Sequence, residues 1–427
     1  MSDDATAKER FRLADFAIAL VVVSYILRAA AAKLLDHSVR TYDFEGHPFY
    51  QTTGNKSGAV GGGLIVLAVV VALAGALSGT RSKPRVQALV TGQLMLAGWW
   101  VITSVIHGEI HGKDLQNLVA VAVIIISVTV ARPGRRVVDL LAGIAVLLAV
   151  STLVYMRLQP DTATLPCRSD KCGSFGTLLT GFFPQENVLV ILMTLLLPTL
   201  VVIRRGLLLF LAWFACALVI LGTGGRAGEL SLLVSAVALV WWRRDWRRFS
   251  GSFMVRFAPI LALAASLLTF LVANGRDLTG RGVLYEVIRQ SLHGADLVVG
   301  PGSATLANAH SSSLTGDFLA VKEHGQAPYL LVHMGAIGVV LFAGILLVVG
   351  FRRAETITQS LGVLALLIAA TEFATESTLE FDSRSYSLFA LAMIFNLITG
   401  DEDESVDEAP ALEAGPRVSR LAARLGP

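Results

Sequence analysis

The chain alternates between long apolar runs and short polar connections over most of its length. The runs are about 15 to 23 residues long, and a helix of that length crosses a hydrocarbon core of roughly 30 Å. One such run could be a buried helix of a soluble domain, but about twelve in series predict a polytopic membrane protein. The predicted spans are residues 14–35, 59–78, 88–106, 115–131, 137–156, 187–203, 206–221, 228–242, 257–273, 330–350, 360–376 and 386–399.

Composition favours the same class of protein. Of the 427 residues, 54% are hydrophobic and 16% are charged, whereas soluble domains carry roughly 25% charged residues. The expected fold is therefore an all-α membrane protein surrounded by lipid. The formal net charge of +3 gives no reason to expect a nucleic-acid partner.

Basic residues recur at every second connection between the predicted spans. The positive-inside rule places these connections in the cytoplasm, together with both termini. The first apolar run is too long for the core of a signal peptide and lacks a small-residue cleavage site, so we expect it to be a retained span. The basic clusters are Arg81/Lys83/Arg85, Arg132/Arg135/Arg136, Arg204/Arg205, Arg243/Arg244/Arg247/Arg248 and Arg352/Arg353.

This sidedness divides the chain into five parts. We expect a cytoplasmic N-terminus at 1–13, nine spans within 14–273, an extracytoplasmic loop at 274–329, three spans within 330–399 and a cytoplasmic, disordered tail at 400–427. Long loops in compact proteins are usually functional or disordered. The 274–329 loop is therefore the first place to look for chemistry.

Two cysteines lie close together on the predicted outer face. Cys167 and Cys172 belong to LPCRSDKCGS, and disulfides persist on that side of a membrane. The Cys-x-x-Cys spacing of a zinc site is absent, so we expect a small loop closed by a disulfide. Cys216 lies inside an apolar run and is expected to be inert packing.

Several charged residues fall within or beside the predicted spans. Arg28 and Lys33 could snorkel to the outer surface, and Glu372 and Glu376 could face water at a span end. Arg226 is different, because GTGGRAGEL places it among glycines at a break between two apolar runs. Backbone N–H groups and a guanidinium can converge there on one anion, although the arginine could instead pair with Glu229 in a turn.

The long outer loop carries three further stretches. GRDLTGRGVLYEVIRQSL contains Arg276 and predicts a helix opened by Thr279, with Arg281 in its first turn and Tyr285 on its apolar face. DLVVGPGSATLANAHSSSL and VKEHGQAPYLLVHMGAIG follow it. The GPG sequence is a tight turn, because the spacing of a nucleotide-binding loop is absent.

Two arginines and a histidine on the outer face suit transfer from a phosphorylated donor to a hydroxyl. Arginines can neutralise charge on a leaving phosphate, and a neutral imidazole can accept a proton near pH 7. No ATP-binding motif accompanies them. The donor is therefore expected to be pre-activated, and a lipid-diphosphate sugar fits that requirement.

The order of these motifs resembles the O-antigen ligase and O-antigen polymerase superfamily of bacterial membrane proteins. LGTGGRAGEL is similar to the family's Thr-Gly-Ser-Arg-Gly segment, with Gly225 for Ser, and TGRGVLYEVI to Ser-Gly-Arg-x-x-x-Trp, with Tyr285 for Trp. DLVVGPGS resembles Gly-x-Gly-Pro-Gly, with Val298 for the first Gly, and FFPQENVLV resembles a Pro-Asn span entrance, with Asn187 matched. The resemblance covers roughly 183–397 in short, scattered motifs.

The family's catalytic histidine precedes a Gly-x-x-Gly span entrance by about eleven residues. HGQAPYLLVHMGAIG keeps that spacing from His324 to Gly335, with Gly325 in place of the usual Asn. His310, in NAHSSSL, competes for the same role because Ala-His-Asn is also a family pattern. We prefer His324, since no Gly-x-x-Gly follows His310 at the right distance.

The resemblance implies a fold like that of the GT-C membrane glycosyltransferases in the bacterial cytoplasmic membrane. It also implies glycan transfer from a polyprenyl diphosphate carrier to an acceptor hydroxyl, with no metal or other cofactor. Whether the acceptor is a glycolipid core, as for a ligase, or another carrier-linked repeat, as for a polymerase, stays open. The expected catalytic residues are His324, Arg281 and Arg226, and the expected substrate-binding residues are His310, Arg276, Tyr285, Asn187 and Arg28.

The alternative is a polytopic transporter or flippase of lipid-linked glycans. Inverted-repeat transporters tend to show similar halves with Gly- or Pro-broken helices in matching positions, and the sequence shows neither. The basic residues also lie at the ends of the spans rather than within them.

Overall fold

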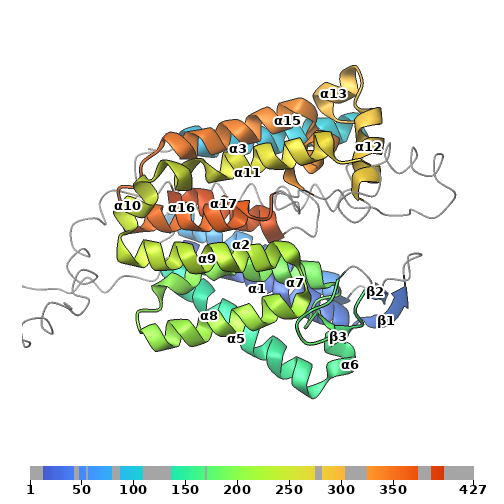
Figure 1. Cartoon of the computed structure of the whole chain (residues 1–427), viewed down its shortest axis with the longest axis vertical. Helices are drawn as coiled ribbons and strands as arrows, with labels where there is room; N and C mark the ends of the chain where they lie inside the picture. The colour runs from blue at the N-terminus through green and yellow to red at the C-terminus, as the bar shows by residue number, and fades with distance from the viewer. Residues whose placement is uncertain are drawn as a thin grey trace, which may run out of the picture.

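A computed structural model describes residues 13–42, 48–53, 56–78, 87–108, 136–168, 171–274, 281–302, 325–373 and 386–398. These residues form an all-α bundle with two small antiparallel sheets (Figure 1). The strands are β1 (His37–Tyr42) paired with β2 (Pro48–Thr53), and β3 (Thr164–Leu165) paired with β4 (Leu178–Leu179). The helices are α1 (Leu13–Leu34), α2 (Lys56–Ser78), α3 (Gln87–Ile106), α5 (Arg136–Leu158), α6 (Pro160–Ala163), α7 (Glu186–Leu196), the 3-10 helix η1 (Leu197–Val202), α8 (Gly206–Thr223), α9 (Arg226–Arg244), α10 (Trp246–Gly251), α11 (Phe253–Val272), α12 (Arg281–Ser291), α13 (Ala295–Val299), α15 (Gln326–Phe351), α16 (Ile357–Ala370) and α17 (Tyr386–Ile398).

Six helices among the described residues are long and apolar enough to cross a membrane. They comprise most or all of α1, α3, α5, α8, α11 and α15, and shorter apolar segments lie in α2, α7–η1 and α16. Each predicted apolar run within the described residues falls largely on a helix, whereas the run 115–131 lies outside them. Six membrane-crossing candidates therefore support a membrane protein, and the count of about twelve spans stays a prediction.

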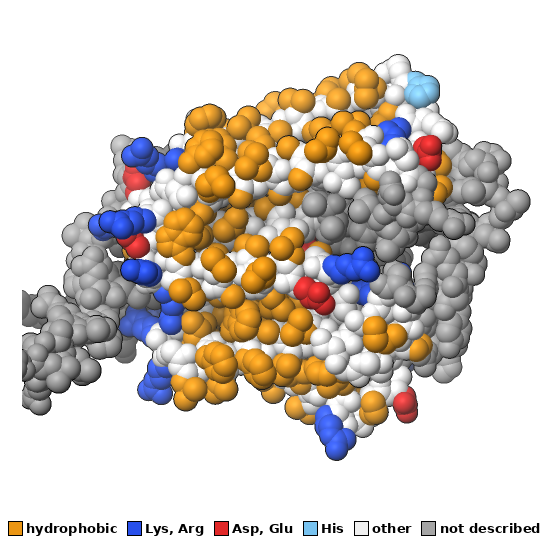
Figure 2. All heavy atoms as spheres, viewed as in Figure 1, with side chains coloured by type: hydrophobic (Ala, Val, Ile, Leu, Met, Phe, Trp, Pro, Cys, Tyr) orange, Lys and Arg blue, Asp and Glu red, His pale blue; other side chains and the backbone are white. Residues whose placement is uncertain are grey.

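The surface separates apolar from basic residues along the bundle. Figure 2 shows an apolar band over the helices, with Lys and Arg side chains gathered at the end that holds α10. We call this the basic end. Arg243 donates to the carbonyl oxygen of Ile203 there, and the indole nitrogen of Trp242 donates to Ser360 Oγ at 2.8 Å.

The opposite end holds α6, α12, α13 and the two small sheets (Figure 1). We call it the loop end. An apolar band with basic residues gathered at one of its ends is the arrangement that the positive-inside rule leads one to expect of a membrane protein.

The centre of the bundle is a buried helical segment, α7–η1. It packs against α5, α8, α9 and α16, and residues 189, 190 and 192–201 are all buried. A helix that is apolar on all sides is stable only when it is surrounded. Pro198 has no N–H group to continue the α-helical ladder, and the segment continues from Leu197 as the six-residue 3-10 helix η1. This segment fixes the positions of the helices that carry the candidate site.

Candidate functional site

The break between α8 and α9 lies at the loop end and places Arg226. Gly224 closes α8 in the left-handed conformation, with φ of 65°, which a glycine adopts without steric cost. The backbone N–H of Gly225 donates to Thr223 Oγ1 at 3.3 Å. Arg226 then begins α9, and its side chain is exposed. The sequence therefore predicted both the position of this break and the arginine at its edge.

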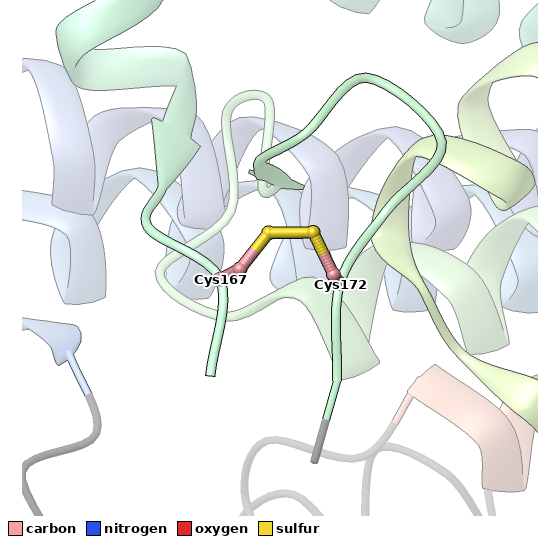
Figure 3. The surroundings of a disulfide bond; sticks show 2 residues. All are labelled: Cys167 and Cys172. Atoms are coloured by element: carbon pink, nitrogen blue, oxygen red, sulfur yellow. A yellow bond between two sulfur atoms is a disulfide. The ribbon is translucent and has the colours of Figure 1, made fainter. Parts of the chain in front are cut away.

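The disulfide loop packs directly on this break. Cys167 and Cys172 are bonded (Figure 3), and the residues that follow run against the end of α8. Ser174 N donates to the carbonyl oxygen of Leu221 at 3.0 Å, and a Cβ at Gly173 would overlap the carbonyl oxygen of Gly222. The loop and the break therefore have no room for a side chain between them.

The other side of the disulfide loop is tied to the first turn of α7. Lys171 Nζ donates to Asn187 Oδ1 at 2.7 Å and to Glu186 Oε1 at 3.1 Å. Arg168 also lies within 3.9 Å of the Glu186 carboxylate, which is buried. Asn187, expected to bind substrate, thus contacts a lysine of the loop in this structure.

The first turn of α9 packs closely on α7. A Cβ at Gly228 would overlap Val190 Cγ2, and a Cβ at Gly225 would lie 3.3 Å from Val190 Cγ1. The backbone on either side of Arg226, the disulfide loop and the entrance of α7 therefore belong to one packed cluster.

A second packed cluster surrounds α12. Tyr285 is 1% exposed, and its ring meets that of Phe270 edge-on at 5.6 Å. Arg289 donates to the carbonyl oxygen of Ala273 at 2.9 Å and lies over the Phe270 ring. The apolar face predicted for this helix is confirmed, and its tyrosine, expected to bind substrate, is buried against α11.

The GPG turn lies against a break inside α15. Gly335 has φ of 62° and ψ of −163°, values outside the helical region, so the α-helical hydrogen bonds are interrupted there. The turn supplies one replacement bond, from Gly302 N to the carbonyl oxygen of Val332 at 3.0 Å. Trp99 Nε1 supplies another, to the carbonyl oxygen of Met334 at 2.8 Å. A Cβ at Gly335 would overlap the carbonyl oxygen of Val298.

A buried polar cluster joins the end of α16 to α9 and to the start of α15. Glu372 is fully buried, and Ser231 Oγ donates to its Oε1 at 2.9 Å. Ser231 also shares a hydrogen bond with Thr371, and Gln326 N donates to the carbonyl oxygen of Phe373 at 2.8 Å. The expectation that Glu372 faces water is wrong, because the last turn of α16 packs between its neighbours rather than ending at the surface.

The two charged residues near the end of α1 differ in their surroundings. Lys33 is only 7% exposed, and its ammonium donates to Thr180 Oγ1, to the carbonyl oxygen of Gly181 and to that of Phe183, at 2.8, 2.7 and 3.2 Å. The snorkelling expected of Lys33 is therefore wrong. Arg28 is half-buried and lies against Gly61 of α2, where a Cβ would come within 2.7 Å of Arg28 Cδ.

The structure describes some of the predicted site residues and not others. Arg226 and Asn187 share the cluster around the α8–α9 break. Arg281 begins α12, which packs against α11 and α15 at the same end of the bundle. Three predicted residues, Arg276, His310 and His324, lie outside the described residues.

Sequence reasoning missed two described residues with polar contacts at the loop end, Lys171 and Ser231, and it expected the wrong surroundings for Glu372. A lysine beside a cysteine, or a serine one turn into an apolar helix, carries no signal in the sequence, because its partner lies in a distant segment. Among the described residues, no group of three or more His, Cys, Asp or Glu side chains is placed to hold a metal ion.

No family model, characterised protein or solved structure matches this chain, so the case for a function rests on its own residues.

Proposed function

We propose that the chain is an O-antigen ligase-like glycosyltransferase of the bacterial cytoplasmic membrane. It moves a glycan from a polyprenyl diphosphate carrier to an acceptor hydroxyl at the outer face. The proposal includes about twelve spans in a GT-C-like arrangement, both termini in the cytoplasm, and a catalytic loop within 274–329.

The packing of the GPG turn on the break of α15 is the observation that best supports this proposal. Gly300–Gly302 and Gly335 were singled out separately from the sequence, and the hydrogen bond from Gly302 N to Val332 brings them together. The α8–α9 break with Arg226 lies at the same end of the bundle. Motifs that are scattered along the chain therefore gather at one end, as the parts of one site would.

In the proposed reaction, the acceptor oxygen attacks the anomeric carbon of the donor sugar. The bond between that carbon and the diphosphate oxygen breaks, and the polyprenyl diphosphate leaves with the bonding electrons. His324 accepts the proton of the acceptor hydroxyl, and Arg226 and Arg281 stabilise the charge on the leaving diphosphate. No step requires a metal or an organic cofactor.

The remaining candidate residues have supporting parts. We assign His310 and Arg276 to the path of the substrates, as the sequence suggested. The contacts of Asn187 with Lys171, of Tyr285 with Phe270 and of Arg28 with Gly61 favour a role in holding the site together rather than direct binding.

Transfer by the purified protein tests the proposal. The protein would be reconstituted in vesicles with a fluorescent polyprenyl diphosphate glycan and one of two acceptors, a lipid A core or a second carrier-linked repeat. Product on the first acceptor identifies a ligase, and product on the second identifies a polymerase. A broken helix such as α15 also occurs in transporters, so movement of the donor across the bilayer without transfer to any acceptor would favour the flippase and refute the enzyme.

A further inference from the structure

The loop that the disulfide closes is held by α7 through charge. Lys171 and Arg168 both approach Glu186 Oε1, and the side chains of Lys171 and Glu186 are only 12% and 7% exposed. A buried carboxylate that loses its partner is strongly unfavourable. Lys171 also donates to Asn187 Oδ1, so two adjacent residues of α7 fix one ammonium group.

The same loop holds the α8–α9 break through its backbone. Gly173 and Ser174 follow Cys172 directly and lie against Leu221 and Gly222. A Cβ at Gly224 would lie 2.8 Å from the carbonyl carbon and oxygen of Cys172. The chain between Gly222 and Gly224 is therefore covered by the residues beside the disulfide.

Arg226 follows this covered segment by two residues. A motion of the disulfide loop would reach Arg226 through Gly224, whose backbone lies directly against that of Cys172. The loop itself depends on the disulfide at its ends and on Lys171 within it. The two links act in series, from α7 through Lys171 to the loop, and from the loop to the break.

We propose that Lys171 is a positioning residue for Arg226, acting through the Cys167–Cys172 loop. The role of Arg226 in binding the donor diphosphate rests on the proposed function. Lys171 needs no contact with the donor, because it fixes the orientation in which Arg226 meets the donor.

Kinetics separate this role from a general loss of folding. Lys171→Ala loosens Arg226 but keeps its guanidinium, which can still stabilise the leaving diphosphate. The donor KM should therefore rise by about tenfold while kcat changes much less. Lys171→Arg retains a cation that reaches Glu186 and should restore most of the affinity. Lys56→Ala, at an exposed lysine on the same end of the bundle, is the matched control and should leave KM unchanged.

A spectroscopic measurement tests the positioning without relying on transfer. A maleimide nitroxide is attached to Leu230→Cys, one turn beyond Arg226, in a Cys216→Ala background that keeps the disulfide. The same label at Val240→Cys, near the basic end of α9, is the control; Leu230 and Val240 are 50% and 71% exposed. Lys171→Ala, and separately reduction of the disulfide, should raise the mobility of the label at 230 and leave the label at 240 unchanged.

Equal mobility at position 230 in the parent protein and in Lys171→Ala would overturn the inference. Raised mobility with an unchanged donor KM would overturn it as well, since Arg226 would then not need the loop in order to bind. Failure of the parent protein to transfer any glycan would refute the proposed function instead. The nitroxide spectra would still decide whether Lys171 holds the break.

Discussion

The backbone nitrogen of Gly302 donates a hydrogen bond to the carbonyl oxygen of Val332 at 3.0 Å. Val332 lies three residues before the break at Gly335. In an unbroken helix, the N–H group four residues further along the chain would have donated to the carbonyl oxygen of Val332. The GPG turn therefore stabilises a broken helix that would otherwise leave a polar group unpaired in the interior. The same bond helps to hold the segment that contains α12 and α13 against α15.

Gly335→Ala is expected to destabilise this junction. A residue with a Cβ is strained at φ of 62° and ψ of −163°, by about 1–3 kcal/mol, and its methyl group would also overlap the carbonyl oxygen of Val298. The thermal midpoint of the purified protein should fall by several degrees, and transfer should fall with it. Size-exclusion chromatography after heating measures the first effect.

Gly344→Ala is the control on the same helix. No atom lies within 4 Å of a Cβ placed there, so alanine should be tolerated or slightly stabilising. Equal midpoints for the two variants would show that the break at Gly335 does not need a glycine.

The basic end is expected to face the cytoplasm and the loop end the exterior. A cysteine replacing the exposed Ala295 should then react with a membrane-impermeant maleimide in intact cells. A cysteine replacing Arg248, whose side chain is 86% exposed, should react only after lysis. Cys216 is buried and Cys167 and Cys172 are paired, so little background is expected. The reverse labelling pattern would show that the loop end faces the cytoplasm. A lipid-linked donor on the outer face could then not reach this site.

The two arginines are expected to act through their planar, two-point geometry. Arg226→Lys and Arg281→Lys keep the charge, but an ammonium cannot reproduce the paired contacts of a guanidinium with phosphate oxygens. Each should lower transfer by about 10²-fold, measured on protein that still purifies as a single species. Arg244→Lys, at the other end of α9, should retain activity. Normal transfer by both loop-end variants would refute their assignment to the diphosphate.

The histidine predictions separate His324 from His310. His324→Ala should reduce kcat by about 10² to 10⁴-fold, as expected for loss of a general base, with donor binding largely retained. The limb of the pH profile near the imidazole pKa of roughly 6.5 should disappear. His310→Ala should be milder. The opposite ranking would assign the general base to His310, in NAHSSSL. Activity in both variants would rule out either histidine as the general base.

The sequence was sufficient for the helices because the signal is local. Apolar runs of spanning length predicted most of α1, α3, α5, α8, α11 and α15, and glycines with an arginine predicted the break after Thr223. The period-3.6 pattern likewise predicted which face of α12 is buried. Each of these inferences needs only neighbouring residues.

The sequence was insufficient where partners come from distant segments. Glu372 lies at the end of an apolar run and was expected to face water, yet Ser231, which lies far from it in the sequence, reaches its carboxylate. Lys33 also lies near the end of an apolar run and was expected to snorkel, yet Thr180, Gly181 and Phe183 accept hydrogen bonds from its ammonium. A charge at a helix end is compatible with either environment, and only the packing of another segment decides between them.

Lys33 provides the final prediction. Its ammonium holds the turn at 180–183 through Thr180 Oγ1 and the carbonyl oxygens of Gly181 and Phe183. Lys33→Met keeps a similar shape but leaves these acceptors short of a donor, and each buried group left unsatisfied costs about 1–3 kcal/mol. The thermal midpoint should therefore fall clearly below that of Lys56→Met, which removes an exposed ammonium. If the two midpoints agree, the cost of keeping a charge in the interior offsets its three hydrogen bonds, and Lys33 does not stabilise the attachment of this turn to α1.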